Sequence, residues 1–312
     1  MLTSPASFQH DALLYEGRDA FLAGTVAFIR EGLHRGEPML VAVGAEKISL
    51  LREALGEPAD EVQFADMAEL GRNPGRIIPA WQNFLLPHAR EGRPVRGIGE
   101  PIWAGRSADE LVECQLHEAL LNVAFADVEG FRLRCPYDVE ALDAAVVHEA
   151  CCSHPALVEG VEVRPSHRYR DGGELLAPFD VPLPTAPPAA ELLGFDRHGL
   201  PEVRDIVARH AGEAGLSRGR AANLVIAVSE VAANSVVHGG GRGVLRVWSE
   251  DDALVFEVRD RGEIKDALAG RHHPDQEQLG GRGLWLAHQF CDLVQLRSGH
   301  DGTVIRLRVH TG

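Results

Sequence analysis

Long apolar runs are missing from this 312-residue chain. The longest, MLVAVGA at residues 39–45, is far shorter than the roughly 20 residues that cross a bilayer. The opening residues, MLTSPASFQHDALLYEG, contain neither a basic stretch nor an extended apolar core, and so they do not look like a secretory signal. The sequence therefore predicts no membrane association and a cytoplasmic location.

Basic residues are also fewer than acidic residues. Lys and Arg total 31 against 46 Asp and Glu, which gives a formal net charge of −15. Such a surface repels nucleic-acid phosphates and anionic lipid. No helix-turn-helix with a basic face is visible. We therefore expect no direct nucleic-acid partner, and a transcription factor is the weakest interpretation.

Cysteines number only five, and no two of them have the CxxC spacing of a metal or redox motif. An odd number without such a pair fits a reducing cytoplasm. Cys151 and Cys152 are adjacent, and we interpret them as packing residues rather than a redox switch. The phosphate-binding pattern GxxxxGK[ST] is missing as well, which excludes a P-loop.

What the chain does have is enough length and apolar content for two domains. Residues 1–159 alternate helical and strand patterns, and the predicted strands are PMLVAVG, VQFAD, VRGIGEP and FRLRCPYD. Repeated βα units predict an α/β domain with a mostly parallel sheet and flanking helices. Ligands of open α/β sheets bind beyond the carboxyl ends of the strands. The candidates for a sensory pocket there are Asp66, Glu100, Trp103, Tyr137 and Asp138.

A change of composition marks the domain boundary. Prolines crowd into residues 160–190 and apolar periodicity is lost, which predicts a semi-rigid linker. Residues 191–312 then show two helical patterns, two strands, an irregular stretch, a third helix and two final strands. This order predicts a two-layer α/β sandwich, with helices on one face of an antiparallel or mixed sheet. Alternation in the last strand predicts that the other face is largely wet.

One helix of this second domain carries an unusual polar pair. In SEVAANSVVHGGG, Glu230 and Asn234 lie one turn apart and therefore on one face. Ser217 is the expected N-cap of this helix, and the glycines from Gly239 are its expected end. An amide oxygen suits a Mg²⁺ ion that bridges phosphates. A carboxylate beside it can take a proton from an attacking hydroxyl.

Two later segments complete a nucleotide-binding pattern. In VRDRG, Asp260 at a strand end can accept a hydrogen bond from an exocyclic amine, and Gly262 lets a base approach the backbone. In LGGRGLWLA, glycines precede a helix whose free amides and dipole attract phosphate.

Together, SEVAANSVVHG, VRDRG, GGRGLWLA and GTVIRL resemble the ordered motifs of the GHKL ATPase superfamily, the Bergerat fold, and most of all its anti-sigma-factor serine/threonine kinases. The resemblance implies ATP and Mg²⁺ as cofactors. It implies that Asn234 ligates Mg²⁺, that Glu230 is the general base and that Asp260 contacts adenine. The other residues it places around the nucleotide are Gly262, Gly281, Arg282, Gly283, Leu284 and Thr303. One departure is Glu263, which stands at a usual glycine and is expected to weaken nucleotide affinity.

The first domain is similar to another family. HDALLYEGRDAFLAGTVAFIREGLHRGEPMLVAV and VRGIGEPIW resemble the MEDS sensory domain. That resemblance implies a RecA-like α/β fold without its nucleotide loop and an unknown small-molecule signal.

These features predict a cytoplasmic sensory regulator that binds ATP and Mg²⁺. By resemblance, it phosphorylates Ser or Thr of an anti-anti-sigma (STAS) partner, sequesters a sigma factor, or does both, and it can form a homodimer. A two-component histidine kinase is an alternative, since His117-Glu118 and His148-Glu149 superficially fit an acceptor pattern. We expect both pairs to belong to sensory-domain helices. A second alternative is a non-catalytic, ATP-gated protein-binding module.

Overall fold

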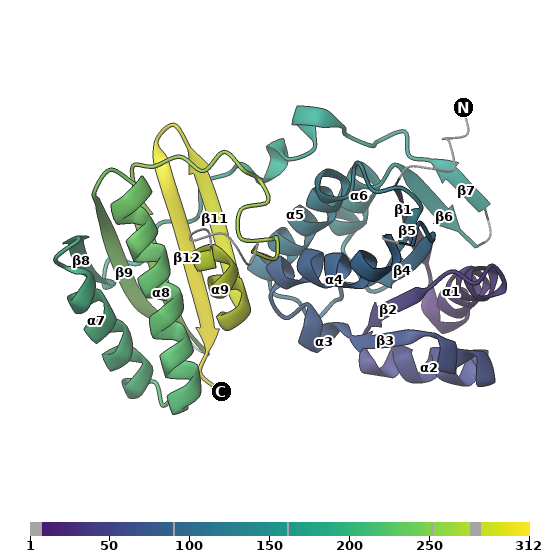
Figure 1. Ribbon diagram of the computed structural model, residues 1–312, viewed down its shortest axis with the longest axis horizontal. Coiled ribbons are helices and arrows are strands. Elements are labelled where there is room, and N and C mark those ends of the chain that lie inside the picture. The colour runs from purple at the N-terminus through teal and green to yellow at the C-terminus, as the bar shows by residue number, and fades with distance from the viewer. Residues whose placement is uncertain (1–7, 90, 161, 251, 275–281) are drawn as a thin grey trace. The chain divides into compact units, whose positions relative to one another are not determined.

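The structure is a computed structural model that describes residues 8–89, 91–160, 162–250, 252–274 and 282–312. The chain divides into two compact units, Met1–Phe179 and Asp180–Gly312 (Figure 1). The division lies inside the segment 160–190. We describe each unit by itself.

The first unit contains a seven-stranded sheet in the order β3-β2-β4-β5-β1-β6-β7. All neighbouring strands are parallel except β6 and β7, which are antiparallel. This confirms the predicted parallel-dominated α/β architecture. The strands are β1 (Gln9–Tyr15), β2 (Met39–Val43), β3 (Gln63–Asp66), β4 (Val95–Gly99), β5 (Phe131–Asp138), β6 (Ala156–Glu159) and β7 (Glu162–Pro165).

Helices alternate with these strands, as the sequence predicts. They are α1 (Gly17–His34), α2 (Ala45–Leu55), α3 (Met67–Leu70), α4 (Ile77–Ala89), α5 (Ala108–Ala124) and α6 (Ala144–Ser153). Strand β2 is buried along its whole length, as its continuous apolar run predicts. Phe21, Phe28 and Ile29 of α1 pack with Val41 and Val43 of β2 in one part of the core.

Strand β1 and part of the segment 160–190 are ordered where the sequence predicts neither a strand nor packing. Strand β1 lies between β5 and β6, but its polar residues hide it from a search for apolar runs. One of them, Asp11, is matched by Arg134 of the neighbouring strand, whose Nε lies 2.7 Å from Oδ1. Within 160–190, β7 pairs with β6, and Leu175 and Phe179 pack against Ala119 of α5.

The second unit is a five-stranded antiparallel sheet in the order β11-β12-β10-β9-β8. Helices α7, α8 and α9 cover one face of it (Figure 1), which confirms the predicted two-layer sandwich. The strand β8 was not predicted. The elements are β8 (Glu191–Asp196), α7 (Leu200–Glu213), α8 (Arg218–His238), β9 (Arg242–Glu250), β10 (Ala253–Asp260), α9 (Arg282–Phe290), β11 (Leu293–Gly299) and β12 (Gly302–His310).

Helix α8 is long and apolar enough, by length and composition alone, to cross a membrane. The search for continuous apolar runs overlooked it. Its inward side belongs to the core between sheet and helices, where Leu224, Val228 and Val231 pack with Phe256 of β10 and Leu307 of β12. The apolar character of α8 is thus used for packing within this unit.

The face of the sheet opposite the helices is more buried than the alternation in β12 predicts. Glu257 of β10 is fully buried, and Arg306 of β12 pairs with it, with Nη2 2.6 Å from Oε2. Nη2 of Arg306 also donates to the carbonyl of Pro184, 2.5 Å away, and the guanidinium lies over the ring of Trp248. The chain near Pro184 covers this position, which is why a charged residue here is buried.

Candidate functional site

Helix α8 carries the polar pair on which the predicted site depends. Ser217 caps its first turn by accepting a hydrogen bond from the backbone N–H of Arg220, and Gly239 caps its end, as the sequence predicts. Glu230 and Asn234 are both half-buried, beside the face that packs in the core. Their spacing of one turn places them on the same side of the helix.

The end of α8 touches the end of β10. A β-carbon on Gly239 would lie only 2.4 Å from Cγ of Asp260, and one on Gly262 would lie 2.8 Å from the backbone oxygen of His238. Side-chain carbons cannot approach so closely, so this contact requires glycine at both positions. Gly262, predicted to let a base approach the backbone, also allows helix α8 and strand β10 to meet.

Both carboxylate oxygens of Asp260 are held by neighbours. Oδ1 accepts a hydrogen bond of 2.7 Å from the backbone N–H of Gly262, and Oδ2 accepts one of 2.5 Å from the hydroxyl of Ser235. A carboxylate oxygen has more than one acceptor position, so Asp260 keeps the capacity to bind a further donor. Sequence reasoning missed Ser235. The available signal was a hydroxyl on the buried side of α8, next to Asn234.

The segment after β10 is fastened to the hairpin of β11 and β12 by hydroxyl groups. Thr303 donates to the carbonyl of Gly262 at 2.8 Å, and its oxygen lies 2.7 Å from that of Ser298. Ser298 in turn accepts from the backbone N–H of Ile264 at 2.7 Å. Thr303 is 3% exposed, so it acts on the site by positioning the backbone around Gly262.

Helix α9 brings the third predicted segment to the same place. A β-carbon on Gly283 would lie 3.1 Å from Nδ2 of Asn234 and 3.1 Å from Oε2 of Glu230. Gly283 therefore packs directly on the polar pair of α8. Arg282 at the start of α9 is exposed, and Leu284 is buried. The predicted Gly281 lies outside the described residues.

These segments enclose a cavity of about 530 Å³. This size is within the range of small-molecule sites. Val231, Leu268 and Ile305 give it apolar walls. The predicted residues that line it are Asn234, Asp260, Gly262, Leu284 and Thr303. Glu230 and Gly283 are not among the described residues that line it, and they lie together beside Asn234.

Charged side chains also reach this cavity. Glu263, the departure noted in the sequence, lines it and is exposed. Lys265, His272 and His273 line it too, and the sequence analysis named none of them. The lining thus combines apolar walls with acceptors on Asp260, Glu263 and Asp266 and a cation on Lys265. Such a mixture suits a ligand with a flat polar ring that donates hydrogen bonds.

The residues predicted for a sensory pocket have separate surroundings in the first unit. Asp66 caps α3 by accepting from the backbone N–H of Ala68 at 2.9 Å. The guanidinium of Arg106 lies over the ring of Trp103, 3.8 Å from its centroid. Tyr137 is buried, with its ring edge-on to His154 and its hydroxyl without a hydrogen-bond partner among the described residues.

Glu100 forms a buried polar group with two residues that the sequence analysis did not name. Its Oε1 lies 2.5 Å from Nζ of Lys47 and accepts a hydrogen bond of 2.9 Å from the hydroxyl of Tyr15, which also accepts from Lys47 at 2.6 Å. Burial raises the pKa of Glu100, and Lys47 only partly offsets this. Asp138 acts in the same direction as burial and raises that pKa further, so it joins the group electrostatically.

Two family models match separate parts of the chain. Residues 9–155 match the family model of MEDS, the methanogen/methylotroph DcmR sensory domain. Residues 196–309 match the model of the histidine kinase-like ATPase domain. Neither model covers residues 156–195, which include the predicted linker.

Among solved structures, the chain is similar to "The crystal structure of the RsbU and RsbW domains of Rv1364c from Mycobacterium tuberculosis". The identity is 22%, the match covers 38% of this chain and 32% of that chain, and the TM-score is 0.29. The chain thus spans about a third of that structure. No match was found among curated proteins.

Proposed function

Because residues 9–155 form a MEDS sensory domain and residues 196–309 a histidine kinase-like ATPase domain, we propose that the protein is a sensory regulator that binds ATP with Mg²⁺. The observation that carries this proposal is the convergence of Asn234, Asp260 and Leu284 around one cavity. They come from three segments separated in sequence, in the order that the ATPase motifs predict.

The residues present fit an adenine nucleotide. Asp260 is fixed on both oxygens and keeps acceptor capacity for an exocyclic amine. Asn234 offers an amide oxygen to Mg²⁺ at the cavity wall. Gly283 and Arg282 at the start of α9 would face phosphate together with the predicted Gly281. When bound, the nucleotide supplies a phosphoryl group for transfer.

In the kinase form of this proposal, Glu230 would accept the proton of an incoming Ser or Thr hydroxyl. Its carboxylate lies against Gly283 at the flank of Asn234 rather than on the cavity wall. This position suits a group that meets the acceptor rather than the nucleotide base. The partner, as implied by the motif resemblance, is a STAS protein, a sigma factor or both.

Binding is tested with a labelled ATP analogue and Mg²⁺ on the full chain. We expect saturable binding to the wild type and a large loss in Asp260→Asn, because the amide offers a donor where the exocyclic amine needs an acceptor. Asp266→Asn is the matched control, since Asp266 also lines the cavity but follows the glycine segment. Absence of binding to the wild type and to Glu263→Gly alike, at millimolar nucleotide, would overturn the proposal.

A non-catalytic binding module is a second candidate, favoured by the carboxylate of Glu263 in the cavity. Glu230→Ala separates the two forms. In a kinase, this change abolishes phosphate transfer to an added partner while analogue binding remains. In a binding module, ATP-dependent partner release is the same in Glu230→Ala and in the wild type.

The histidine-kinase alternative receives no support from the geometry. His117 and His148 lie on α5 and α6 of the sensory domain, as expected. His117 is buried, and Glu118 beside it belongs to a buried cluster described below. Acid-labile phosphate on the chain after incubation with ATP would revive this alternative.

A further inference from the structure

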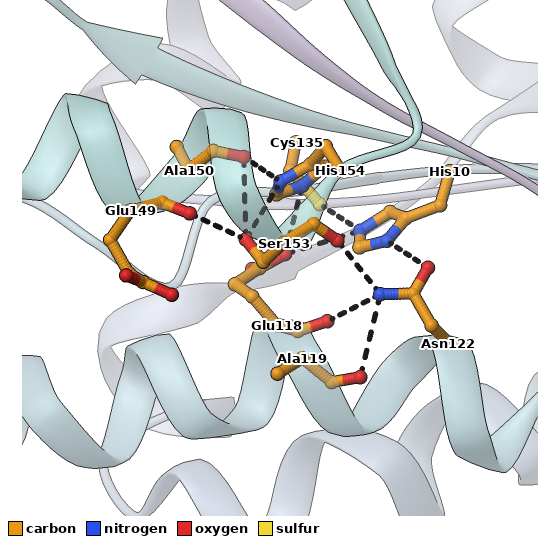
Figure 2. A network of polar contacts seen from close by, with 9 residues as sticks. All are labelled: His10, Glu118, Ala119, Asn122, Cys135, Glu149, Ala150, Ser153 and His154. Atoms are coloured by element: carbon orange, nitrogen blue, oxygen red, sulfur yellow. Dashed lines mark hydrogen bonds and ion pairs between the residues drawn. The ribbon is translucent and has the colours of Figure 1, made fainter. Parts of the chain in front are cut away.

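Four side chains of metal-ligating type converge inside the sensory domain. His10 lies on β1, Glu118 on α5, Cys135 on β5, and His154 directly follows α6. All four are buried, and their ligand atoms lie within 4.8 Å of one another. The rings of the two histidines are 4.0 Å apart between centroids, with Cys135 beside them (Figure 2). None of the four belongs to the proposed nucleotide site.

The distances between these atoms match the edges of a tetrahedron around a metal ion. Nε2 of His10 lies 3.2 Å from Oε2 of Glu118 and 3.4 Å from Sγ of Cys135, and Nε2 of His154 lies 3.2 Å from the same Oε2. Tetrahedral zinc has bonds of about 2.0–2.1 Å to nitrogen and oxygen and about 2.3 Å to sulfur, so its ligand atoms are about 3.3–3.6 Å apart. Three edges of the cluster are close to that length before any adjustment.

Both imidazole rings are oriented for metal binding by their other nitrogen. Nδ1 of His154 donates to the carbonyl of Ala150 at 2.8 Å. Nδ1 of His10 lies 3.1 Å from Oδ1 of Asn122, whose amide nitrogen donates to the carbonyl of Ser153 at 2.8 Å and is thereby fixed (Figure 2). Each ring therefore turns Nε2 toward the cluster. A hydrogen bond of this kind from the second ring nitrogen is the usual support of a ligating histidine.

Two fully buried polar atoms of the cluster have no hydrogen-bond partner in the part of the chain that the structure describes. They are Nε2 of His154 and Oε1 of Glu118. Nε2 of His154 lies close to the Glu118 carboxylate without the geometry of a hydrogen bond. Buried polar atoms of proteins are nearly always satisfied, so these two atoms point to a ligand at the centre of the cluster.

We propose that His10, Glu118, Cys135 and His154 bind one divalent transition-metal ion, and that zinc is the ion that fits best. Two imidazoles, one thiolate and one carboxylate form the closed, four-ligand set of a structural zinc site. Mg²⁺ and Ca²⁺ require more oxygen ligands. Binding releases the thiol proton of Cys135 to solvent, and the thiolate and carboxylate then neutralise the ion. The loaded site has no net charge, as its burial requires.

The experiment uses the full chain, stripped of metal with a chelator and titrated with Co²⁺ as a visible substitute for zinc. We expect one equivalent of Co²⁺ to bind, with thiolate-to-cobalt charge-transfer absorption that added Zn²⁺ abolishes. Cys135→Ser should lose this absorption. Cys114→Ser should keep it, because Cys114 is an equally buried thiol of the same domain whose Sγ contacts the carbonyl of Pro101 instead.

The wild type alone can overturn the proposal, even if Cys135→Ser fails to fold. Zinc should raise the melting temperature of the stripped chain by several degrees, because an ion that binds only the folded state stabilises it. A folded, stripped chain that takes up far less than one equivalent of Co²⁺ and shows no change in melting temperature with zinc would show that the cluster is a hydrogen-bonded core. Equal loss of absorption in Cys114→Ser would also overturn it.

Discussion

The hydroxyl of Ser235 donates a hydrogen bond of 2.5 Å to Oδ2 of Asp260 and so ties helix α8 to the end of strand β10. Ser235 is 1% exposed, and its neighbour Asn234 lines the cavity. Within one helical turn, Ser235 positions the carboxylate of Asp260 and Asn234 lines the cavity. This bond and the one from the backbone N–H of Gly262 together fix the orientation of the Asp260 carboxylate.

Ser235→Ala should weaken the binding of a labelled ATP analogue several-fold, because the carboxylate of Asp260 loses one of its two fixed contacts. It should also lower the free energy of unfolding by about 1.5–3 kcal/mol, as expected for a lost hydrogen bond to a charged group. Analogue titration and urea unfolding measure the two effects. Ser229→Ala is the control on the same helix, since the buried Ser229 hydroxyl has no hydrogen-bond partner within the described ranges. Equal effects of both changes would contradict the assignment.

Gly239→Ala should destabilise the second unit by about 1–3 kcal/mol, the usual cost of overpacking. The added methyl group would lie 2.4–2.6 Å from three atoms of the Asp260 side chain. Because it displaces that carboxylate, it should also reduce analogue binding. Thermal unfolding provides the measurement. Gly219→Ala on the same helix meets no atom within 4 Å and should instead stabilise slightly. A neutral Gly239→Ala would show that α8 and β10 are less closely packed.

Glu263→Gly should tighten binding of the ATP analogue several-fold, since it removes a carboxylate that lines the cavity directly after Gly262. Glu263→Gln keeps the size of the side chain and removes only its charge. A gain in both variants assigns the effect to charge repulsion, whereas a gain in glycine alone assigns it to crowding. Titrations at low and high salt check this, because salt screens only the charge effect. Unchanged affinity in both variants would make Glu263 neutral for binding.

The buried group around Glu100 predicts a pH dependence of stability. Burial raises the pKa of Glu100 above its ordinary value of 4.5, so the folded state binds this proton more tightly than the unfolded state. The stability that this proton contributes is present below pH 4.5 and is lost as pH rises toward the folded pKa. Glu100→Gln should abolish this part of the pH dependence, as measured by melting temperature between mildly acidic and neutral pH.

Lys47→Met should extend that loss to higher pH, because it removes the cation 2.5 Å from the Glu100 carboxylate and so raises the pKa of Glu100 further. Near neutral pH we expect a destabilisation on the order of 2 kcal/mol, below the cost for a fully buried pair because Lys47 is partly exposed. Arg18→Met is a suitable control, since Arg18 contacts Glu53 in an exposed pair. A melting temperature of Lys47→Met that stays parallel to the wild type at every pH would contradict the coupling.

The second domain was predictable in detail because its signals are local. The Ser217 cap, the terminal Gly239 and the one-turn spacing of Glu230 and Asn234 all lie within one helix, and the structure has each of them. Strand β8 escaped because its residues, ELLGFD, alternate in exposure at the edge of the sheet and carry no long apolar run. Ser235 escaped because its partner, Asp260, is 25 residues away in sequence.

In the first domain the limit of sequence reasoning was topology. The parallel sheet followed from repeated βα units, but the position of β1 beside β5 did not. That position is what brings His10 to Cys135 across a sequence separation of 125 residues, and to Glu118 across 108. His117-Glu118 was noticed only as a sequence pair, and Cys135 only as one of five cysteines. The predicted sensory pocket stays a hypothesis. Asp138 acts on Glu100, whereas Asp66, Trp103 and Tyr137 have other neighbours.

The covered outer face of the second sheet also determines where the second unit can be separated from the rest of the chain. Leu183 is buried, Arg306 binds the carbonyl of Pro184, and Arg297 binds that of Val181 at 3.2 Å. A recombinant fragment beginning at residue 191 would expose Glu257 and Arg306 to water on one side. A fragment that contains the second unit alone should therefore begin no later than Asp180, so that the proline segment still covers this face of the sheet.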